Sequence, residues 1–259
     1  MKKIIALTVL LFSHWAYADD GLKAYWDAAQ EFQRQIEQKS ASGGLPRLSD
    51  AKTAHLFSVL SDHKRFLQER KYGLKDVTEL MRVCGKSNEI SAYYMQLGMG
   101  EVAQKNGEFP EMMADAMMDL VAKNTIIYQD EISALQSFSV RCRAILFPLH
   151  LESIFSLNAG IQSQDIMNKN LEAWFIYKSV LQSLGRIEIN HANKLRLAQA
   201  LAESSKQYLP FIPLDGRVEM TALIKRVQEA SEPDVSRQLD KIITTLSSKE
   251  CGWVCQLDI

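Results

Sequence analysis

The sequence has no surplus of positive charge. Its 259 residues include 30 lysine and arginine residues against 31 aspartate and glutamate residues, which gives a formal net charge of −1. Proteins that bind nucleic acid neutralise phosphates with a basic surface. This balance of charge therefore argues against a nucleic-acid partner.

Long apolar runs are missing as well. After residue 18 nothing approaches the roughly 20 apolar residues that a membrane-spanning helix needs. The apolar run at residues 4–12 is too short, but it follows Lys2 and Lys3 and precedes Ala-Tyr-Ala at residues 16–18, the three parts of a secretory signal peptide. We predict cleavage after residue 18 and export to the periplasm. The mature chain then begins at Asp19, with 28 basic and 31 acidic residues and a net charge of −3.

Short motifs that identify an active site are absent. There is no His-Glu-x-x-His zinc motif and no Gly-x-Ser-x-Gly nucleophile turn. The two glycines in residues 97–101 follow no strand, so they do not indicate a phosphate-binding loop. We predict no catalytic residue, no cofactor and no metal site, and we leave open an active site that the fold assembles from distant residues.

Four histidines remain after the predicted cleavage: His55, His63, His150 and His191. His55 and His63 would lie about 80° apart on one helix, and they lack the spacing of a zinc pair on one turn. His150 is close to Glu152 and Ser153, but a Ser–His–acid site is recognised by its geometry in space. We expect surface or capping roles for the four histidines, with His150 in the first turn of a short helix.

Methionines are concentrated in one part of the chain: Met95, Met99, Met112, Met113, Met117 and Met118. Thioethers bind Cu(I), so copper handling is one hypothesis, although no histidine or cysteine lies near them in sequence. We favour a role in filling the core, with an adaptable contact surface as the second interpretation. The acid pairs Asp115/Asp119 and Asp130/Glu131 are expected to be solvated on helices. A glycoside hydrolase would need two carboxylates across a cleft, which the sequence does not exclude.

There are only four cysteines: Cys84, Cys142, Cys251 and Cys255. In an oxidising compartment an even number favours disulfides, and four cysteines allow three pairings. We predict Cys84–Cys142 and Cys251–Cys255, because the cost of closing a loop grows with its length and Gly252 loosens the short ring. A redox pair is less favoured because it requires Cys-x-x-Cys after a strand. A zinc site needs about four ligands, which the tail pair reaches only if Cys84 and Cys142 join it.

Strand patterns are almost absent, since the alternating residues 186–190 are too few to matter. Apolar residues instead recur at helical spacings of three and four between capping residues, glycines and prolines. The predicted helices are 21–39, 49–73, 74–84, 87–106, 110–147 as one helix or two, 149–157, 163–184, 190–208, 217–230 and 233–248. We predict an all-α, non-repeating, disulfide-stapled bundle of about nine or ten helices. It forms a single domain over residues 19–259, with a possible linker at residues 40–50 and the helix around residues 172–180 at its centre.

An exported helical chain without a catalytic pattern suits a protein that works by binding another protein, such as a secreted toxin or an envelope enzyme. The profile is similar, in general character only, to small exported immunity proteins, which inhibit a toxin delivered to the periplasm. No motif carries that likeness. The alternatives are a cell-envelope hydrolase with an unrecognised active site and a copper-handling protein that uses its methionines.

Overall fold

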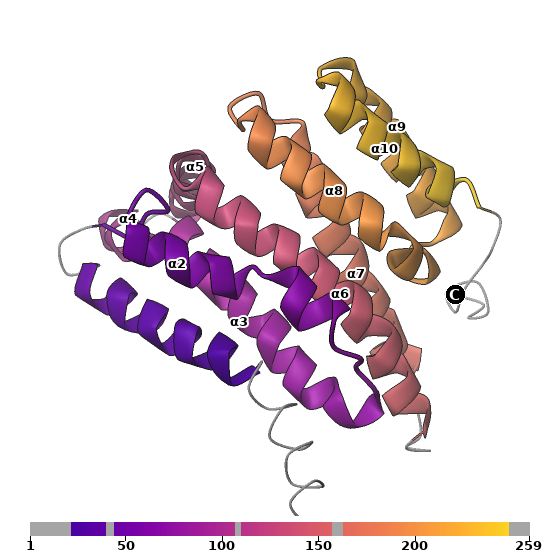
Figure 1. Ribbon diagram of the computed structural model, residues 1–259. Helices are drawn as coiled ribbons and strands as arrows, with labels where there is room; N and C mark the ends of the chain where they lie inside the picture. The colour runs from indigo at the N-terminus through magenta and orange to yellow at the C-terminus, as the bar shows by residue number, and fades with distance from the viewer. Residues whose placement is uncertain (1–21, 40–43, 107–109, 157–162, 249–259) are drawn as a thin grey trace, which may run out of the picture. The chain divides into compact units, whose positions relative to one another are not determined.

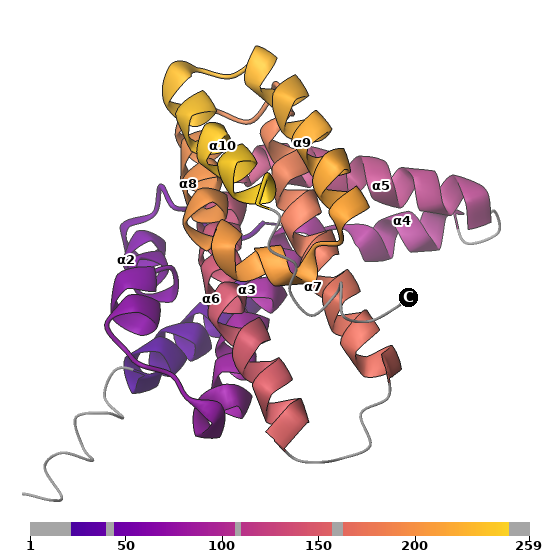
Figure 2. The same ribbon diagram turned by 90° about the vertical axis from the view of Figure 1, so that its right-hand side faces the viewer.

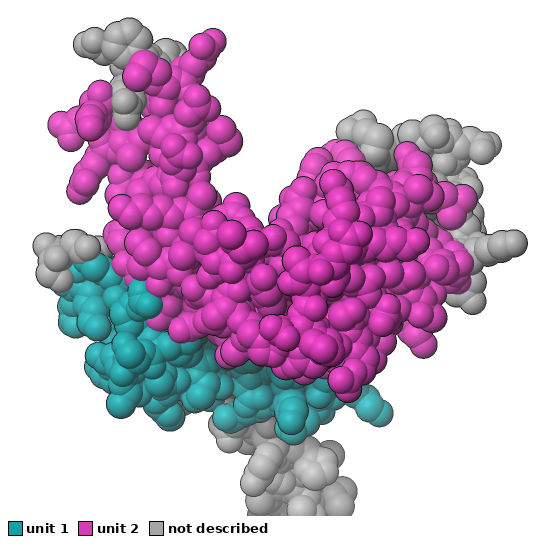
Figure 3. All heavy atoms as spheres, turned by 90° about the horizontal axis from the view of Figure 1, so that it is seen from above, with its two compact units in different colours: residues 1–71 teal, residues 72–259 magenta. Residues whose placement is uncertain are grey.

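The structure is a computed structural model that describes residues 22–39, 44–106, 110–156 and 163–248 (Figure 1). These residues form ten helices and no strand, which confirms the predicted all-α fold. The predicted signal peptide, Cys251 and Cys255 lie outside the described residues. The chain divides into two compact units, residues 1–71 and 72–259, which Figure 3 colours separately. The single domain over residues 19–259 stays a prediction.

Unit 1 is built on the helix over residues 22–39 and on α2 (Ala51–Leu60). Aromatic side chains join them: the rings of Phe32 and Phe57 meet edge to face with centroids 5.2 Å apart. Tyr25 makes a second edge contact, at 5.4 Å, with Phe66 in the turn at Lys64–Gln68 that follows α2, and all four rings are buried. These contacts explain why the first helix has an apolar stripe.

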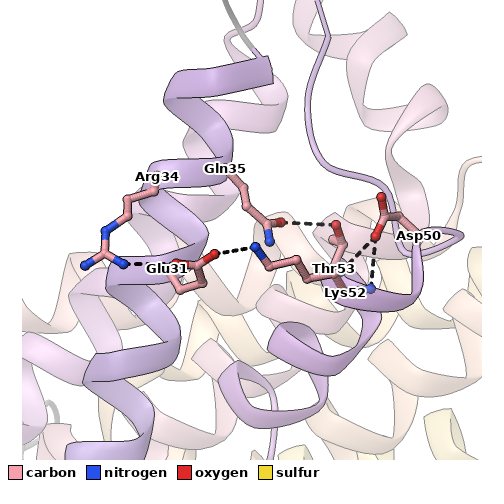
Figure 4. Close-up of polar contacts among 6 residues, drawn as sticks. All are labelled: Glu31, Arg34, Gln35, Asp50, Lys52 and Thr53. Carbon is pink, nitrogen blue, oxygen red and sulfur yellow. Dashed lines mark hydrogen bonds and ion pairs between the residues drawn. The ribbon is translucent and has the colours of Figure 1, made fainter.

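Polar side chains fix the same pair of helices (Figure 4). The carboxylate of Asp50 accepts from the backbone N–H groups of Lys52 and Thr53, which confirms Asp50 as the N-cap of α2. Thr53 Oγ1 donates to Gln35 Oε1 at 3.3 Å, with both side chains buried. Glu31 receives Lys52 Nζ at 2.6 Å, and this ammonium group is the main reason that the pKa of Glu31 is lowered.

The helix predicted at residues 49–73 is interrupted. α2 ends at Leu60, and one π-helical turn follows at Lys64–Gln68. Two short polar side chains compete with the helical hydrogen bonds at the break. Ser61 Oγ donates to the carbonyl of Phe57 at 2.6 Å, and Asp62 Oδ1 accepts from the N–H of Arg65 at 3.1 Å.

Unit 2 is a bundle in which α6 packs against α3, α7 and α8, and α10 packs against α8 and α9. Two short 3₁₀ turns, Leu74–Asp76 and Leu209–Phe211, connect some of its helices. The helices are α3 (Val77–Met95), α4 (Met99–Asn106), α5 (Pro110–Ile127), α6 (Gln129–Ser156), α7 (Ser163–Leu184), α8 (His191–Tyr208), α9 (Leu214–Glu229) and α10 (Pro233–Leu246).

The fully buried side chains in the core of unit 2 include Tyr177 on α7 and Tyr208 on α8. Their hydroxyls donate to the carbonyls of Leu201 and Val140 at 3.1 and 3.2 Å, which satisfies both groups away from water. Burial raises the pKa of both phenols, so they remain protonated at neutral pH. The central position predicted for residues 172–180 is only half right. One face of α7 is buried, but Phe175 on the other is 61% exposed.

The disulfide between Cys84 and Cys142 joins α3 to α6, as the sequence predicts. Both cysteines are buried. The same two helices are joined by Ser87 Oγ, which donates to the carbonyl of Leu135 at 3.0 Å, and by Ser139 Oγ, which donates to Asn88 Oδ1 at 2.7 Å. The second predicted pair, at residues 251 and 255, is not tested.

Two predicted helix breaks are wrong because tertiary packing overrides the local preference. α3 passes through Gly85 without interruption. α6 continues through Pro148, although proline removes one helical hydrogen bond. The helix continues because Phe147 and Leu151, on either side of the proline, are buried in the core. The helix predicted at residues 87–106 is instead interrupted between α3 and α4, at Gly98. The φ of Gly98 is +85°, a conformation that glycine adopts without steric cost.

The packing of α7 against α9 depends on a glycine, Gly216, whose backbone contacts the indole ring of Trp174. A Cβ atom placed on Gly216 would lie 2.6 Å from the ring of Trp174. Lys178 Nζ lies 5.4 Å from the centre of the same Trp174 ring and pairs with Glu219 of α9 at 2.5 Å. Glycine at position 216 therefore lets the indole approach the backbone of α9.

We expect Gly216→Ala to lower the free energy of unfolding by about 1–3 kcal/mol, because the added methyl group must displace the indole. Gly85→Ala is the matched control: this glycine also lies inside a helix, but nothing is within 4 Å of the added Cβ. There we expect a gain of about 0.5–1 kcal/mol from helix propensity. Urea unfolding of both variants measures the difference, and equal changes would contradict the described contact.

Candidate functional site

The four histidines are divided between the two units. His55 and His63 belong to unit 1, and His150 and His191 to unit 2. His191 Nε2 lies 3.1 Å from Asp234 Oδ2, which links α8 to α10 at the surface. His150 is half-buried inside α6, so its predicted place in a first helical turn is wrong because α6 continues through Pro148.

Among the described residues, no group of three or more histidine, cysteine, aspartate or glutamate side chains is placed to hold a metal ion. Within the same part of the chain, no helix is both long and apolar enough to cross a bilayer.

Of the two acid pairs, Asp130/Glu131 lies at the start of α6, and Asp130 has a structural role. Asp130 Oδ1 accepts from Asn193 Nδ2 at 2.6 Å and from Asn190 Nδ2 at 3.2 Å, and so holds the beginning of α8. Glu131 is buried, contrary to the expectation of a solvated side chain, because it lies on the face of α6 that the core covers. Asp115 and Asp119 are exposed, as expected.

The methionines lie on α3, α4 and α5, and none of the six is buried. Met112 and Met118 are 60% and 63% exposed, while Met95, Met99, Met113 and Met117 are half-buried. The prediction that they fill the core is therefore wrong. Helical spacing indicated an apolar stripe, but the outer part of α5 has little of unit 2 beside it.

α4 and the outer part of α5 form an arm, which we define as the described residues 99–106 and 110–123. α4 packs against α5, and Figure 2 shows the two helices side by side, projecting from the rest of unit 2. No residue of 99–105 or 111–123 is buried. Isolated helices of this length are marginally stable in water without tertiary packing. A partner that covers the apolar surface of the arm would therefore stabilise both helices.

The base of the arm is fixed by specific contacts. Asn124, which is buried, donates through Nδ2 to the carbonyls of Met95 at 3.1 Å and Leu97 at 2.9 Å. These bonds tie α5 to the end of α3. The side chain of Leu120 lies close to Gly98 at the turn into α4: a Cβ atom added to this glycine would be 3.7 Å from it. The arm therefore leaves unit 2 in a defined direction.

The outer face of α5 combines acidic and thioether side chains. Glu111, Asp115 and Asp119 follow one another at intervals of four residues and form one exposed row. From the helical angle of 100° per residue, Met112 and Met118 flank this row on its two sides. Among the described residues none of the three carboxylates has an ion-pair or hydrogen-bond partner, and like charges at this spacing destabilise a helix by about 0.2–0.5 kcal/mol per pair.

No protein-family model, curated protein or solved structure matches the chain. Among the described residues, the arm is the feature that bears on function.

Proposed function

We propose that the chain is exported to the periplasm and acts there by binding another protein through the arm. The supporting observation is that two packed helices project from unit 2 with apolar side chains and without a single buried residue in 99–105 or 111–123. Burying apolar surface is the main driving force of protein association, at roughly 25 cal/mol per Å².

The chemistry of the arm selects a partner. Three exposed carboxylates in a row favour a basic surface, and electrostatic complementarity raises both the association rate and the specificity. Met112 and Met118 add polarizable, adaptable contacts beside that row. The partner that fits is a protein with a cleft or helix that presents apolar side chains together with lysine or arginine.

An inhibitor of a toxin delivered to the periplasm is the kind of binder that we propose. A preformed helical arm loses little conformational freedom when it enters a cleft, so less of the binding energy is spent on ordering. The bonds from Asn124 to the end of α3 support such preorganisation. The hydrolase and copper hypotheses stay predictions of the sequence, and no contact in the described residues favours either.

Full-length protein should retain its partner from periplasmic extract or from secreted proteins of neighbouring cells, and Met112→Lys/Met118→Lys should lose it. We expect the affinity to fall at least about tenfold, which corresponds to 1.4 kcal/mol, because each substitution removes apolar contact and places a positive charge against the basic surface of the partner. Surface plasmon resonance with the recovered partner measures this. Because both methionines are mostly exposed, the melting temperature should hardly change.

Met81→Lys is the matched control. Met81 is 43% exposed on α3, outside the arm, so this variant should bind as the wild type does. Raising the salt concentration from about 50 to 200 mM should weaken wild-type binding, since exposed charge pairs are screened. Retention of the same partners by the arm variant would refute the proposed function.

A further inference from the structure

A second surface, distinct from the arm, lies on the outer side of α9. Leu214 and Val218 are 54% and 71% exposed, and with Ala222 they form a stripe at intervals of four residues. Together with Leu246 at the end of α10, they line a groove of about 750 Å³. α9 thus has apolar residues on two sides, because Met220, Ile224 and Val227 are buried on its inner side.

The chain leaves the described structure in the wall of this groove. Ser247 and Ser248 follow α10 and line the groove, as does Arg217. Arg217 Nη1 donates to the carbonyl of Ser248 at 2.9 Å, and Arg217 is itself buried. The point at which the last segment begins is therefore held against α9.

The last segment has the length and the composition to cover the stripe. It comprises residues 249–259, which reach up to about 36 Å when fully extended and about 28 Å when the predicted Cys251–Cys255 bond closes its ring. The part of α9 that lines the groove, from Leu214 to Lys225, is only about 16 Å long. The segment carries Trp253, Val254, Leu257 and Ile259 as apolar residues. It also carries Glu250 and Asp258, and Lys225 offers a positive charge at the groove.

We propose that residues 249–259 dock along this groove, with Trp253 over Leu214 and Val218. Attachment at Ser248 gives the segment an effective concentration in the millimolar range, so weak apolar contacts are sufficient to hold it. The groove is therefore an internal docking site for residues 249–259 and is separate from the partner-binding arm.

Hydroxyl-radical footprinting of the full-length protein, read out by mass spectrometry, tests this placement. Trp253 should be modified about tenfold more slowly than in a free peptide of residues 249–259, a factor that corresponds to 1.4 kcal/mol of docking free energy. In full-length Val218→Asp/Ala222→Asp the protection should be lost, because the stripe becomes charged. The arm is untouched, so partner binding should persist.

Ile187→Asp is the control, since Ile187 is 84% exposed outside the groove. It should leave the protection of Trp253 unchanged. The proposal is overturned if Trp253 reacts as fast as in the free peptide, or if the groove variant keeps full protection. It is also overturned if protection grows with protein concentration, because a second copy would then occupy the groove.

Discussion

Replacing both partners of the disulfide, as Cys84→Ala/Cys142→Ala, is expected to lower the free energy of unfolding by about 2–4 kcal/mol. The two cysteines are separated by 58 positions in the sequence, so their bond removes many conformations from the unfolded chain. They also lie at the buried contact of α3 with α6. Alanine avoids burying an unpaired hydroxyl at these sites, which serine would introduce.

For a chain of this size, such a loss should lower the melting temperature by roughly 5–15 °C. The measurement is thermal unfolding of the wild type and the variant without reductant, and again with reductant, which should destabilise the wild type far more than the variant. Cys251→Ala/Cys255→Ala is the control, because a ring that short should contribute less. A double variant at residues 84 and 142 that melts with the wild type under oxidising conditions would show that the disulfide does not stabilise this fold.

The sequence predicted the helices well where their ends are determined locally. Asn190 caps α8 through its side chain, which accepts from the N–H of Asn193 at 2.9 Å. Ser163 begins α7, and the helix ends at Leu184, directly before Gly185. In each case the residues that set the boundary lie within a few positions of it, so a local pattern contains the necessary information.

The errors arise where distant residues decide. Gly85 and Pro148 disfavour a helix locally, yet α3 and α6 continue through them because the two helices pack against each other and the core. Similarly, the sequence predicts that Glu131 on α6 is solvated, and only the tertiary packing shows that this side chain is buried. Local propensity is a weak guide once a helix is fixed by tertiary contacts.

The arm was missed for the same reason. The spacing of Met113, Met117 and Leu120 is that of a core-facing helix, and the sequence does not say whether anything covers that face. The exposed row of Glu111, Asp115 and Asp119 is the local feature that could have suggested otherwise. Three acids on one face, with methionines beside them, are better suited to contact with a basic partner than to a core.

Arg217 holds together the other end of unit 2. Its side chain lies among three backbone carbonyls: Nε donates to Ile212 at 3.1 Å, Nη2 to Leu209 at 3.1 Å and Nη1 to Ser248 at 2.9 Å. Burial lowers the pKa of the guanidinium. Arginine nevertheless stays protonated in proteins, so the bonds are charge-assisted. They join α9, the turn after α8 and the residues that follow α10.

Arg217→Met keeps much of the side-chain volume but removes every donor, so buried carbonyls lose their partners. We expect the free energy of unfolding to fall by about 2–4 kcal/mol, because each hydrogen bond to a charged group contributes about 1.5–3 kcal/mol, offset in part by the cost of burying the charge. Arg217→Lys should recover only part of the loss, since one ammonium cannot reproduce the planar set of donors. Arg226→Met, at an exposed position on α9, is the matched control and should change stability by less than about 0.5 kcal/mol. Urea unfolding gives the magnitudes, and hydrogen exchange gives the location: exchange should accelerate in residues 209–212 in Arg217→Met and not in Arg226→Met. If it accelerates equally in both, Arg217 does not organise this end of the bundle.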